Sequence, residues 1–232
     1  MTIRIERTAL EIALHNALIA TSKDPSRPIL EGAVFETTVV EKESNSTLEL
    51  SITATDSYRL VSTKIQTSQS PLPSKNSAFQ NAFQRRIIVG DIKGMLAAVK
   101  KMAPGFVSIN EDDNVIELRE GSSTTLEERP TFWSPSIEGD YPQWQGLVPA
   151  LDATNPGCPP PAFNPAFLSD VGKLRHPSMN GTSVKNVRDS KMVLINRYVD
   201  TRTPTIWHFT RDHHADLQAF MLLMPVKYEV AE

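Results

Sequence analysis

The sequence has little of what would place it outside the cell or in a membrane. A single cysteine, Cys158, excludes an internal disulfide framework. The longest apolar runs, such as residues 220–226, are far shorter than the roughly 20 residues that cross a bilayer. Residues 1–20 carry acids and a histidine within their apolar stretch, so they lack the core of a signal peptide. We therefore expect a cytoplasmic protein without a membrane partner.

The net charge of the chain is close to zero. The chain has 24 Lys and Arg against 27 Asp and Glu, for a formal net charge of −3. This balance argues against a protein that coats nucleic acid over its whole surface, although it allows a local basic strip. At 232 residues and 40% hydrophobic content the chain can bury a real core. Its length corresponds to about one and a half average domains.

Three helix-like stretches recur along the chain, at residues 8–21, 90–102 and 164–175. Apolar residues follow helical spacing in each of them. Asp91 and Asn164 stand at the N-terminal ends of the second and third stretch, where acids and capping side chains are favoured. These patterns predict three amphipathic helices.

After each helix the apolar period changes from three or four to two, which indicates strands. The expected strands lie at residues 29–38, 47–54, 58–65, 106–110, 114–119, around 131, 182–187, 192–198 and 205–226, the last interrupted by a polar turn at 211–216. Polar or Pro-rich segments at 66–83 and 150–161 separate three units of strand, helix and three strands. Hairpin-like succession predicts an α+β fold, with antiparallel sheets and helices on one face.

The search for catalytic motifs is mostly negative. The sequence contains no P-loop, GxGxxG, GxSxG, HExxH or CxxC pattern, which removes the common enzyme classes, and we expect no cofactor. His208, His213 and His214 with Asp212 are the only candidates for a small metal-dependent hydrolase, but their spacing does not place them on one face, and a solvated turn is the better interpretation. Asp56 is more typical of a turn-capping carboxylate than of a catalytic acid.

Five strings resemble, in the same order, motifs of the bacterial DNA polymerase III beta subunit, the sliding clamp. They are RPILEGAVFE (27–36), LSITATDSYRLVS (50–62), IEGDYPQWQGLVP (137–149), AFNPAFLSDV (162–171) and FMLLMPVKY (220–228). Together the ATDxxRL turn, the GxxPxxxxLxP element and the MPV ending are specific, and the similarity spans nearly the whole chain.

The resemblance implies the DNA-clamp fold of repeated β-α-β-β-β units, in a shortened or divergent form such as a phage or mobile element carries. Residues 1–149 resemble the middle domain with two units, 150–161 form a linker, and 162–232 resemble half of the last domain. No part of this sequence resembles the family's first domain, so we expect a clamp without it. The implied function is that of a non-enzymatic processivity factor in DNA replication or repair.

The resemblance also implies a peptide-binding pocket between the two domains. A replicative polymerase, clamp loader or repair protein would dock there through a short linear motif. Gly146 stands where the family often has a basic residue, and Lys227 replaces its usual arginine. The pocket residues carried over are Thr55, Ser57, Tyr58, Arg59, Leu60, Pro142, Leu147, Leu222, Met224, Pro225 and Val226.

DNA contact and ring closure are weaker expectations. Clamps hold double-stranded DNA without reading its sequence, through cations on their helices. The candidates here are Lys93, Lys100 and Lys101 on the second helix and Lys173 and Arg175 on the third, although ordinary solvated helix faces fit them equally well. A homo-oligomeric ring is one expectation. Paired units alternate around the family's rings, however, and a chain of three units cannot keep that alternation by simple repetition. The alternative is a clamp-like decoy that binds the motifs without encircling DNA.

Overall fold

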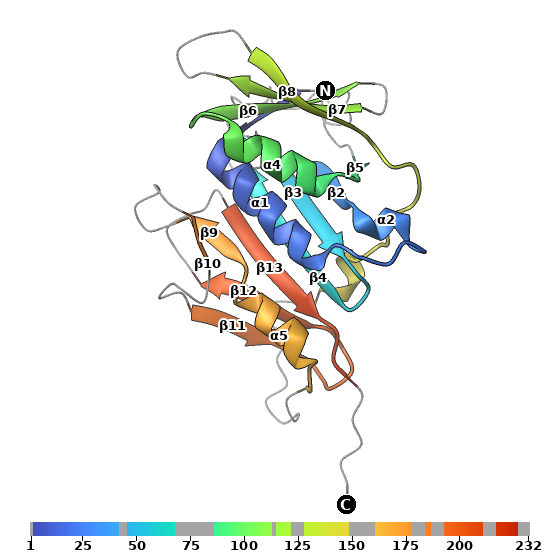
Figure 1. Ribbon diagram of the computed structural model, residues 1–232. Coiled ribbons are helices and arrows are strands. Elements are labelled where there is room, and N and C mark those ends of the chain that lie inside the picture. Colours follow the sequence, from blue (N-terminus) through green and yellow to red (C-terminus); the bar gives the residue numbers. More distant parts are fainter. Residues whose placement is uncertain are drawn as a thin grey trace, which may run out of the picture.

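The computed structural model describes most of the chain as antiparallel sheets with helices packed against them (Figure 1). No helix of this described part is long and apolar enough to cross a membrane. The described residues are 2–41, 46–67, 86–112, 115–121, 128–148, 161–177, 184–186, 193–210 and 217–226.

The first unit contains both predicted and unpredicted elements. Glu6 caps its main helix, because the Glu6 carboxylate accepts a hydrogen bond of 2.7 Å from the Ala9 amide. A short helix that begins at Pro28 occupies the place where we expected a strand to start, so that part of the strand prediction is wrong. Proline is favoured in the first helical turn because its missing N–H has no partner to lose there. The elements are β1 (Thr2–Glu6), α1 (Arg7–Ala20), α2 (Pro28–Glu31), β2 (Ala33–Glu41), β3 (Ser46–Thr55) and β4 (Arg59–Gln66).

The second unit repeats the order of strand, helix and three strands. Asp91, expected as an acid near the positive end of the helix dipole, also caps its helix, because its Oδ1 accepts a hydrogen bond of 2.7 Å from the Gly94 amide. Lys100 and Lys101 lie in the last turn, where cations oppose the negative end of the helix dipole. The elements are β5 (Arg86–Val89), α4 (Ile92–Lys101), β6 (Phe106–Asp112), β7 (Val115–Gly121) and β8 (Glu128–Pro135).

The first two units exchange their first strands. Strand β1 pairs with β6 of the second unit, and β5 pairs with β2 of the first, in both cases antiparallel. One sheet therefore has the order β1-β6-β7-β8, while β5 borders the strands of the first unit. Side chains from both units, such as Leu14 and Met95, are fully buried in one core between the sheets and the helices. The two units thus form a single packed body.

The third unit extends the sheet of the first. Strand β13 pairs antiparallel with β4, so seven strands run in the order β11-β12-β13-β4-β3-β2-β5. A 3-10 turn, η1 (Gln145–Leu147), lies in the segment that follows β8. The elements of the third unit are α5 (Pro165–Val171), β9 (Arg175–Pro177), β10 (Val184–Asn186), β11 (Val193–Arg197), β12 (Thr205–Thr210) and β13 (Leu217–Leu223).

Helix α5 is shorter than the predicted third helix. Asn164 caps it and Pro165 opens it, as expected. It ends at Val171, so Arg175 lies on strand β9 and not on the helix. The expected interruptions at 68–83, 150–160 and 211–216 lie outside the described residues. Antiparallel pairing is confirmed for every described strand pair.

Asn16 of α1 ties the third unit to the first. This side chain is fully buried and completes the edge of β9 as a strand would. Its Nδ2 donates to the Arg175 carbonyl at 3.2 Å and to the Thr63 hydroxyl at 3.3 Å, and its Oδ1 accepts from the Arg175 amide at 2.7 Å. The contact joins α1, β4 and β9.

Candidate functional site

A row of side chains crosses the seven-stranded sheet near the ends of its central strands. Ile206 lies opposite Leu222, Leu222 opposite Leu60, and Leu60 opposite Thr55, on four successive strands. Residues that face each other across antiparallel strands share one face of the sheet. Trp144, from the segment after β8, packs on this row and forms a buried cluster with its three apolar members.

Three members of this row, Thr55, Leu60 and Leu222, form the floor of a pocket of about 220 Å³. This is smaller than a typical site of roughly 300–1,000 Å³ for a drug-sized molecule, and it suits one or two side chains. The strand ends of β4 and β13 form one wall and the segment after β8 forms the other. The lining residues are Thr55, Ser57, Arg59, Leu60, Pro142, Gln143, Trp144, Leu147, Pro204, Leu222 and Met224.

Eight of the eleven predicted pocket residues line this pocket; the other three, Tyr58, Pro225 and Val226, do not. Tyr58 is 61% exposed and stacks on Phe167 of α5, with ring centroids 5.9 Å apart. The Val226 amide donates to the Ala162 carbonyl at 2.8 Å, which fixes the chain beyond β13. The sequence had placed all eleven together by resemblance alone. That any of them binds a peptide stays a prediction.

Three lining residues escaped the sequence prediction. Trp144 and Gln143 lie within the YPQWQGL stretch, beside the predicted Pro142, and the apolar bulk of Trp144 was the available signal. Pro204 gave no local signal, because it reaches the pocket only through the pairing of β12 with β13.

The turn between β3 and β4 shapes one side of the pocket. The Asp56 Oδ1 accepts hydrogen bonds from the amides of Tyr58 and Arg59, each at 3.0 Å, which confirms the predicted turn-capping role. Ser57 has a φ of 78°, in the left-handed region that side chains other than glycine, asparagine and aspartate seldom adopt. The Thr55 hydroxyl donates to the Arg59 carbonyl at 2.8 Å and closes the turn.

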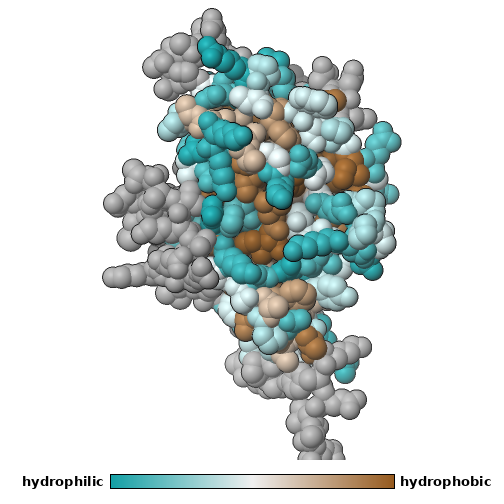
Figure 2. Space-filling model, viewed as in Figure 1, coloured by the Kyte–Doolittle hydropathy of each residue, from teal (hydrophilic) through white to brown (hydrophobic). Residues whose placement is uncertain are grey.

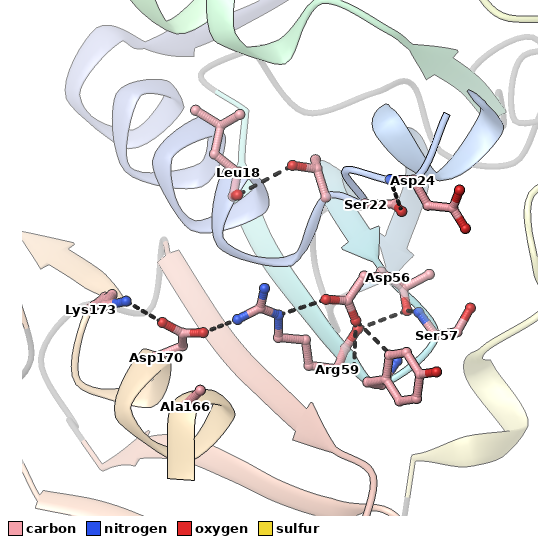
Figure 3. A network of polar contacts seen from close by, with 12 residues as sticks. Leu18, Ser22, Asp24, Asp56, Ser57, Arg59, Ala166, Asp170 and Lys173 are labelled. Atoms are coloured by element: carbon pink, nitrogen blue, oxygen red, sulfur yellow. Dashed lines mark hydrogen bonds and ion pairs between the residues drawn. The ribbon is translucent and has the colours of Figure 1, made fainter. Parts of the chain in front are cut away.

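The Arg59 guanidinium is held by two carboxylates (Figure 3). Its Nε contacts the Asp56 Oδ2 at 2.9 Å, and its Nη1 is paired with the buried Asp170 of α5. Its Cζ also lies 4.8 Å from the centre of the Phe167 ring. Its charge is therefore neutralised locally and is not spare for a ligand.

Tyr141 anchors the second wall. Its hydroxyl oxygen accepts a hydrogen bond from the Thr55 amide at 2.9 Å, and its carbonyl accepts from Arg86 Nη2 at 3.2 Å. Burial raises the pKa of Tyr141 to about 12, so the phenol stays neutral. These contacts hold Pro142 and Trp144 against the sheet without any ligand.

Exposed apolar side chains surround the pocket mouth. Met224 and Leu147 line the pocket and remain 37% and 48% exposed. Tyr58, which is more exposed still, is joined to Met224 because the Met224 amide donates to the Tyr58 carbonyl at 2.9 Å. Apolar groups gathered at a concave site are typical of a surface that binds another molecule.

The predicted DNA-facing cations divide into two groups. Lys93, Lys100 and Lys101 are exposed on α4. The other two are paired, since Lys173 Nζ lies 2.5 Å from Asp170 and Arg175 Nη1 lies 3.7 Å from Glu11. The view onto the helices in Figure 2 shows hydrophilic side chains interspersed with hydrophobic ones, with a hydrophobic area between α1 and β13. Among the described residues, the three α4 lysines are therefore the predicted DNA-facing cations for which no ion pair is seen.

His15 of α1 is a partly buried histidine whose pKa is lowered. Burial is the largest cause that lowers its pKa to about 4, and the charges of Arg175 and Lys100 act in the same direction. A hydrogen bond to the Lys173 backbone opposes the shift in part. His15 is thus neutral at physiological pH.

The metal hypothesis receives no support from the described residues, among which no group of three or more His, Cys, Asp or Glu could hold an ion. His208 lies on β12, paired with Phe220 of β13. Asp212, His213 and His214 lie outside the described residues.

Comparison with known proteins rests on structure alone. The sequence matches no protein-family profile and no curated protein. The structure matches the DNA polymerase sliding clamp from Bacillus subtilis with a TM-score of 0.60 at 15% identity, covering 99% of this chain and 65% of that one. The fold is that of a bacterial sliding clamp.

Two further solved sliding clamps match this chain with similar TM-scores and coverage. The DNA polymerase III beta subunit of Streptococcus pyogenes matches with a TM-score of 0.61 at 13% identity, covering 98% of this chain and 66% of that one. A sliding clamp from Bartonella birtlesii, solved with bound griselimycin, matches with a TM-score of 0.59 at 18% identity, covering 98% of this chain and 66% of that one. This chain therefore spans about two thirds of the length of the solved clamps.

Proposed function

We propose that this chain is a non-enzymatic, sliding-clamp-like accessory protein of DNA replication or repair, and that it binds short peptide motifs in the pocket. The observation that carries the proposal is the apolar pocket at the junction of β4 and β13, on a clamp fold, with exposed apolar residues at its mouth.

The chemistry of the pocket favours a short linear motif. Its floor of Leu60, Leu222 and Trp144 offers apolar surface for one or two anchoring side chains. The wall held by Tyr141 is preformed, so the protein loses little conformational entropy on binding. A flexible peptide does lose entropy, and we therefore expect moderate affinity.

The domain assignment follows the same proposal. Residues 1–149 correspond to one whole clamp domain, residues 150–161 to a linker, and residues 162–232 to half of a further domain. The pocket then lies where the half domain joins the whole one, through the β4–β13 pairing. Partners would be a polymerase, a clamp loader or a repair protein. Griselimycin bound to the Bartonella birtlesii clamp supports ligand binding by a protein of this fold.

Non-specific contact with double-stranded DNA is the second part of the proposal. The exposed Lys93, Lys100 and Lys101 of α4 would contact phosphates, and such contacts weaken as salt rises. Light scattering combined with retention on circular DNA separates the two forms of the proposal. A closed oligomer that stays on circular DNA indicates a clamp, whereas a monomer that binds the peptide indicates a decoy.

Fluorescence anisotropy tests the peptide site. The probe is a labelled, amidated octapeptide with two leucines and one phenylalanine as apolar anchors. Met224→Asp places a charge at the pocket and should weaken binding by more than about tenfold. Val115→Asp is the matched control, because Val115 is also 37% exposed but lies on β7 of the other sheet. No saturable binding up to about millimolar peptide, or equal loss in both variants, contradicts the proposal.

A further inference from the structure

Asp170 of α5 is connected to the pocket through Arg59, although Asp170 itself is buried and does not line the pocket. Its Oδ2 is paired with Arg59 Nη1, and Arg59 Nε lies 2.9 Å from the Asp56 Oδ2. On the other side, Lys173 Nζ lies 2.5 Å from the Asp170 Oδ1. Figure 3 shows the resulting row of alternating charges, which runs from α5 to the turn between β3 and β4. The row thus joins the third unit to the turn that shapes the pocket.

The turn at the end of this row contains a strained residue. Ser57, which lines the pocket, has a φ of 78°, where its Cβ crowds the backbone. Such a conformation persists only where several contacts of the surrounding structure impose it. Two of these contacts come from the turn itself, since the Ser57 amide donates to the Thr55 hydroxyl at 3.1 Å and the Asp56 Oδ1 accepts from the two following amides. The pocket wall at Ser57 therefore depends on how firmly the Asp56 carboxylate is held.

Asp56 uses its two carboxylate oxygens for different contacts. Oδ1 accepts from the turn amides, whereas Oδ2 accepts from Arg59. The position of the Arg59 guanidinium therefore decides whether the Asp56 carboxylate keeps this orientation. Asp170 fixes that guanidinium from the third unit, and the ring of Phe167 packs against it. The side chains of Asp56, Arg59 and Asp170 are all largely buried, so solvent and salt screen their ion pairs less than they screen an exposed pair.

We propose that Asp170 is a positioning residue for the peptide pocket. It holds Arg59, and through Arg59 the Asp56 carboxylate, so that the turn keeps Ser57 in its left-handed conformation before a peptide arrives. This inference rests on the proposed peptide-binding function. A site that is correctly formed in only a fraction of the molecules binds with an affinity reduced by that fraction. The affinity of the pocket therefore depends on a helix that contributes no lining residue.

Anisotropy titrations with the amidated octapeptide of two leucines and one phenylalanine measure this dependence in the full chain. Asp170→Asn removes the charge with little change of shape and should weaken peptide binding by about fivefold or more. Ser57→Gly provides the discriminating background, because glycine adopts a positive φ without steric cost. In a chain that already carries Ser57→Gly, adding Asp170→Asn should weaken binding by less than about twofold.

A control variant separates positioning from a general loss of stability. Ile116 is fully buried on β7 of the other sheet, so Ile116→Ala destabilises the fold away from the turn. It should leave the affinity of the folded protein for the octapeptide unchanged. Hydrogen exchange adds a local measurement: the amides of Tyr58 and Arg59 should exchange faster in Asp170→Asn, while the amides of β7 keep their rates.

The outcomes distinguish this inference from the proposed function. If the octapeptide binds the unchanged chain and Asp170→Asn with equal affinity, the positioning role is overturned and the peptide pocket stands. An equal loss of affinity with and without Ser57→Gly also overturns the positioning role, and so does the same loss in Ile116→Ala, since either result indicates general structural support. Failure of the unchanged chain to bind the octapeptide overturns both proposals.

Discussion

The buried Asn16 is the most informative single position for the stability of the fold, because it joins α1 to the third unit. Replacement by alanine removes the acceptor of the Arg175 amide and the donor to the Arg175 carbonyl, whose distances are 2.7 Å and 3.2 Å. Each buried polar group that loses its partner costs about 1–3 kcal/mol. The weaker 3.3 Å contact with the Thr63 hydroxyl adds a smaller amount. Because both Arg175 contacts are only partly buried, each should cost less than the upper limit, and we expect Asn16→Ala to lower the free energy of unfolding by about 2–4 kcal/mol.

Urea unfolding followed by circular dichroism measures this change. Thr63→Val is the control, because it removes only the hydroxyl partner and leaves the pairing of Asn16 with β9 in place; its cost should stay below about 1 kcal/mol. Asn16→Asp keeps an acceptor for the Arg175 amide but buries an ionised group with no exposure, so it should destabilise more than alanine at neutral pH and recover as the pH falls. A loss of less than about 1 kcal/mol for Asn16→Ala would refute the reasoning, since it would mean that β9 does not depend on this side chain.

Two further predictions concern charged groups. Asp170→Asn leaves the largely buried Arg59 with one carboxylate and should lower the free energy of unfolding in urea by about 2–3 kcal/mol. Glu117→Gln breaks the more exposed pair with Arg119 and should lower it by less than about 0.5 kcal/mol. Similar losses for the two variants would contradict the difference in burial between the two pairs. The pKa of His15 is lowered to about 4 from 6.5, so between these pH values the unfolded chain binds more protons than the folded chain. The contribution of neutral His15 to the free energy of unfolding is therefore present above pH 6.5 and is lost as the pH falls toward 4. His15→Gln should flatten that part of the stability profile measured by urea unfolding at several pH values, and an unchanged profile would refute the assignment.

Local sequence signals predicted the features that depend on neighbouring residues. Asn164 caps its helix as expected, and Asp91 lies at the start of its helix as expected, because these positions depend only on amides two or three residues away. Asp56 forms the predicted turn for the same reason. The end of α5 was misjudged, since nothing near Arg175 signals that its backbone pairs with Asn16, 159 residues away.

The candidate site shows the same division. Resemblance placed eight lining residues, because their strings are contiguous in the sequence. It missed Pro204, whose place in the pocket depends on the pairing of β12 with β13. It also did not show that Asp170, 111 residues away in the sequence, neutralises the charge of Arg59.

What the sequence determined by itself was the position of the three main helices and of most strands, the α+β class and the likeness to sliding clamps, because periodicity, caps and contiguous motifs are properties of short segments. Only the tertiary structure decided that the first two units exchange strands, that β13 continues the sheet at β4, and that Asp170 of α5 neutralises Arg59. The physical reason is that sheet order and ion pairing depend on which distant segments pack together, and that choice is made by the burial of the whole core rather than by any one stretch of chain.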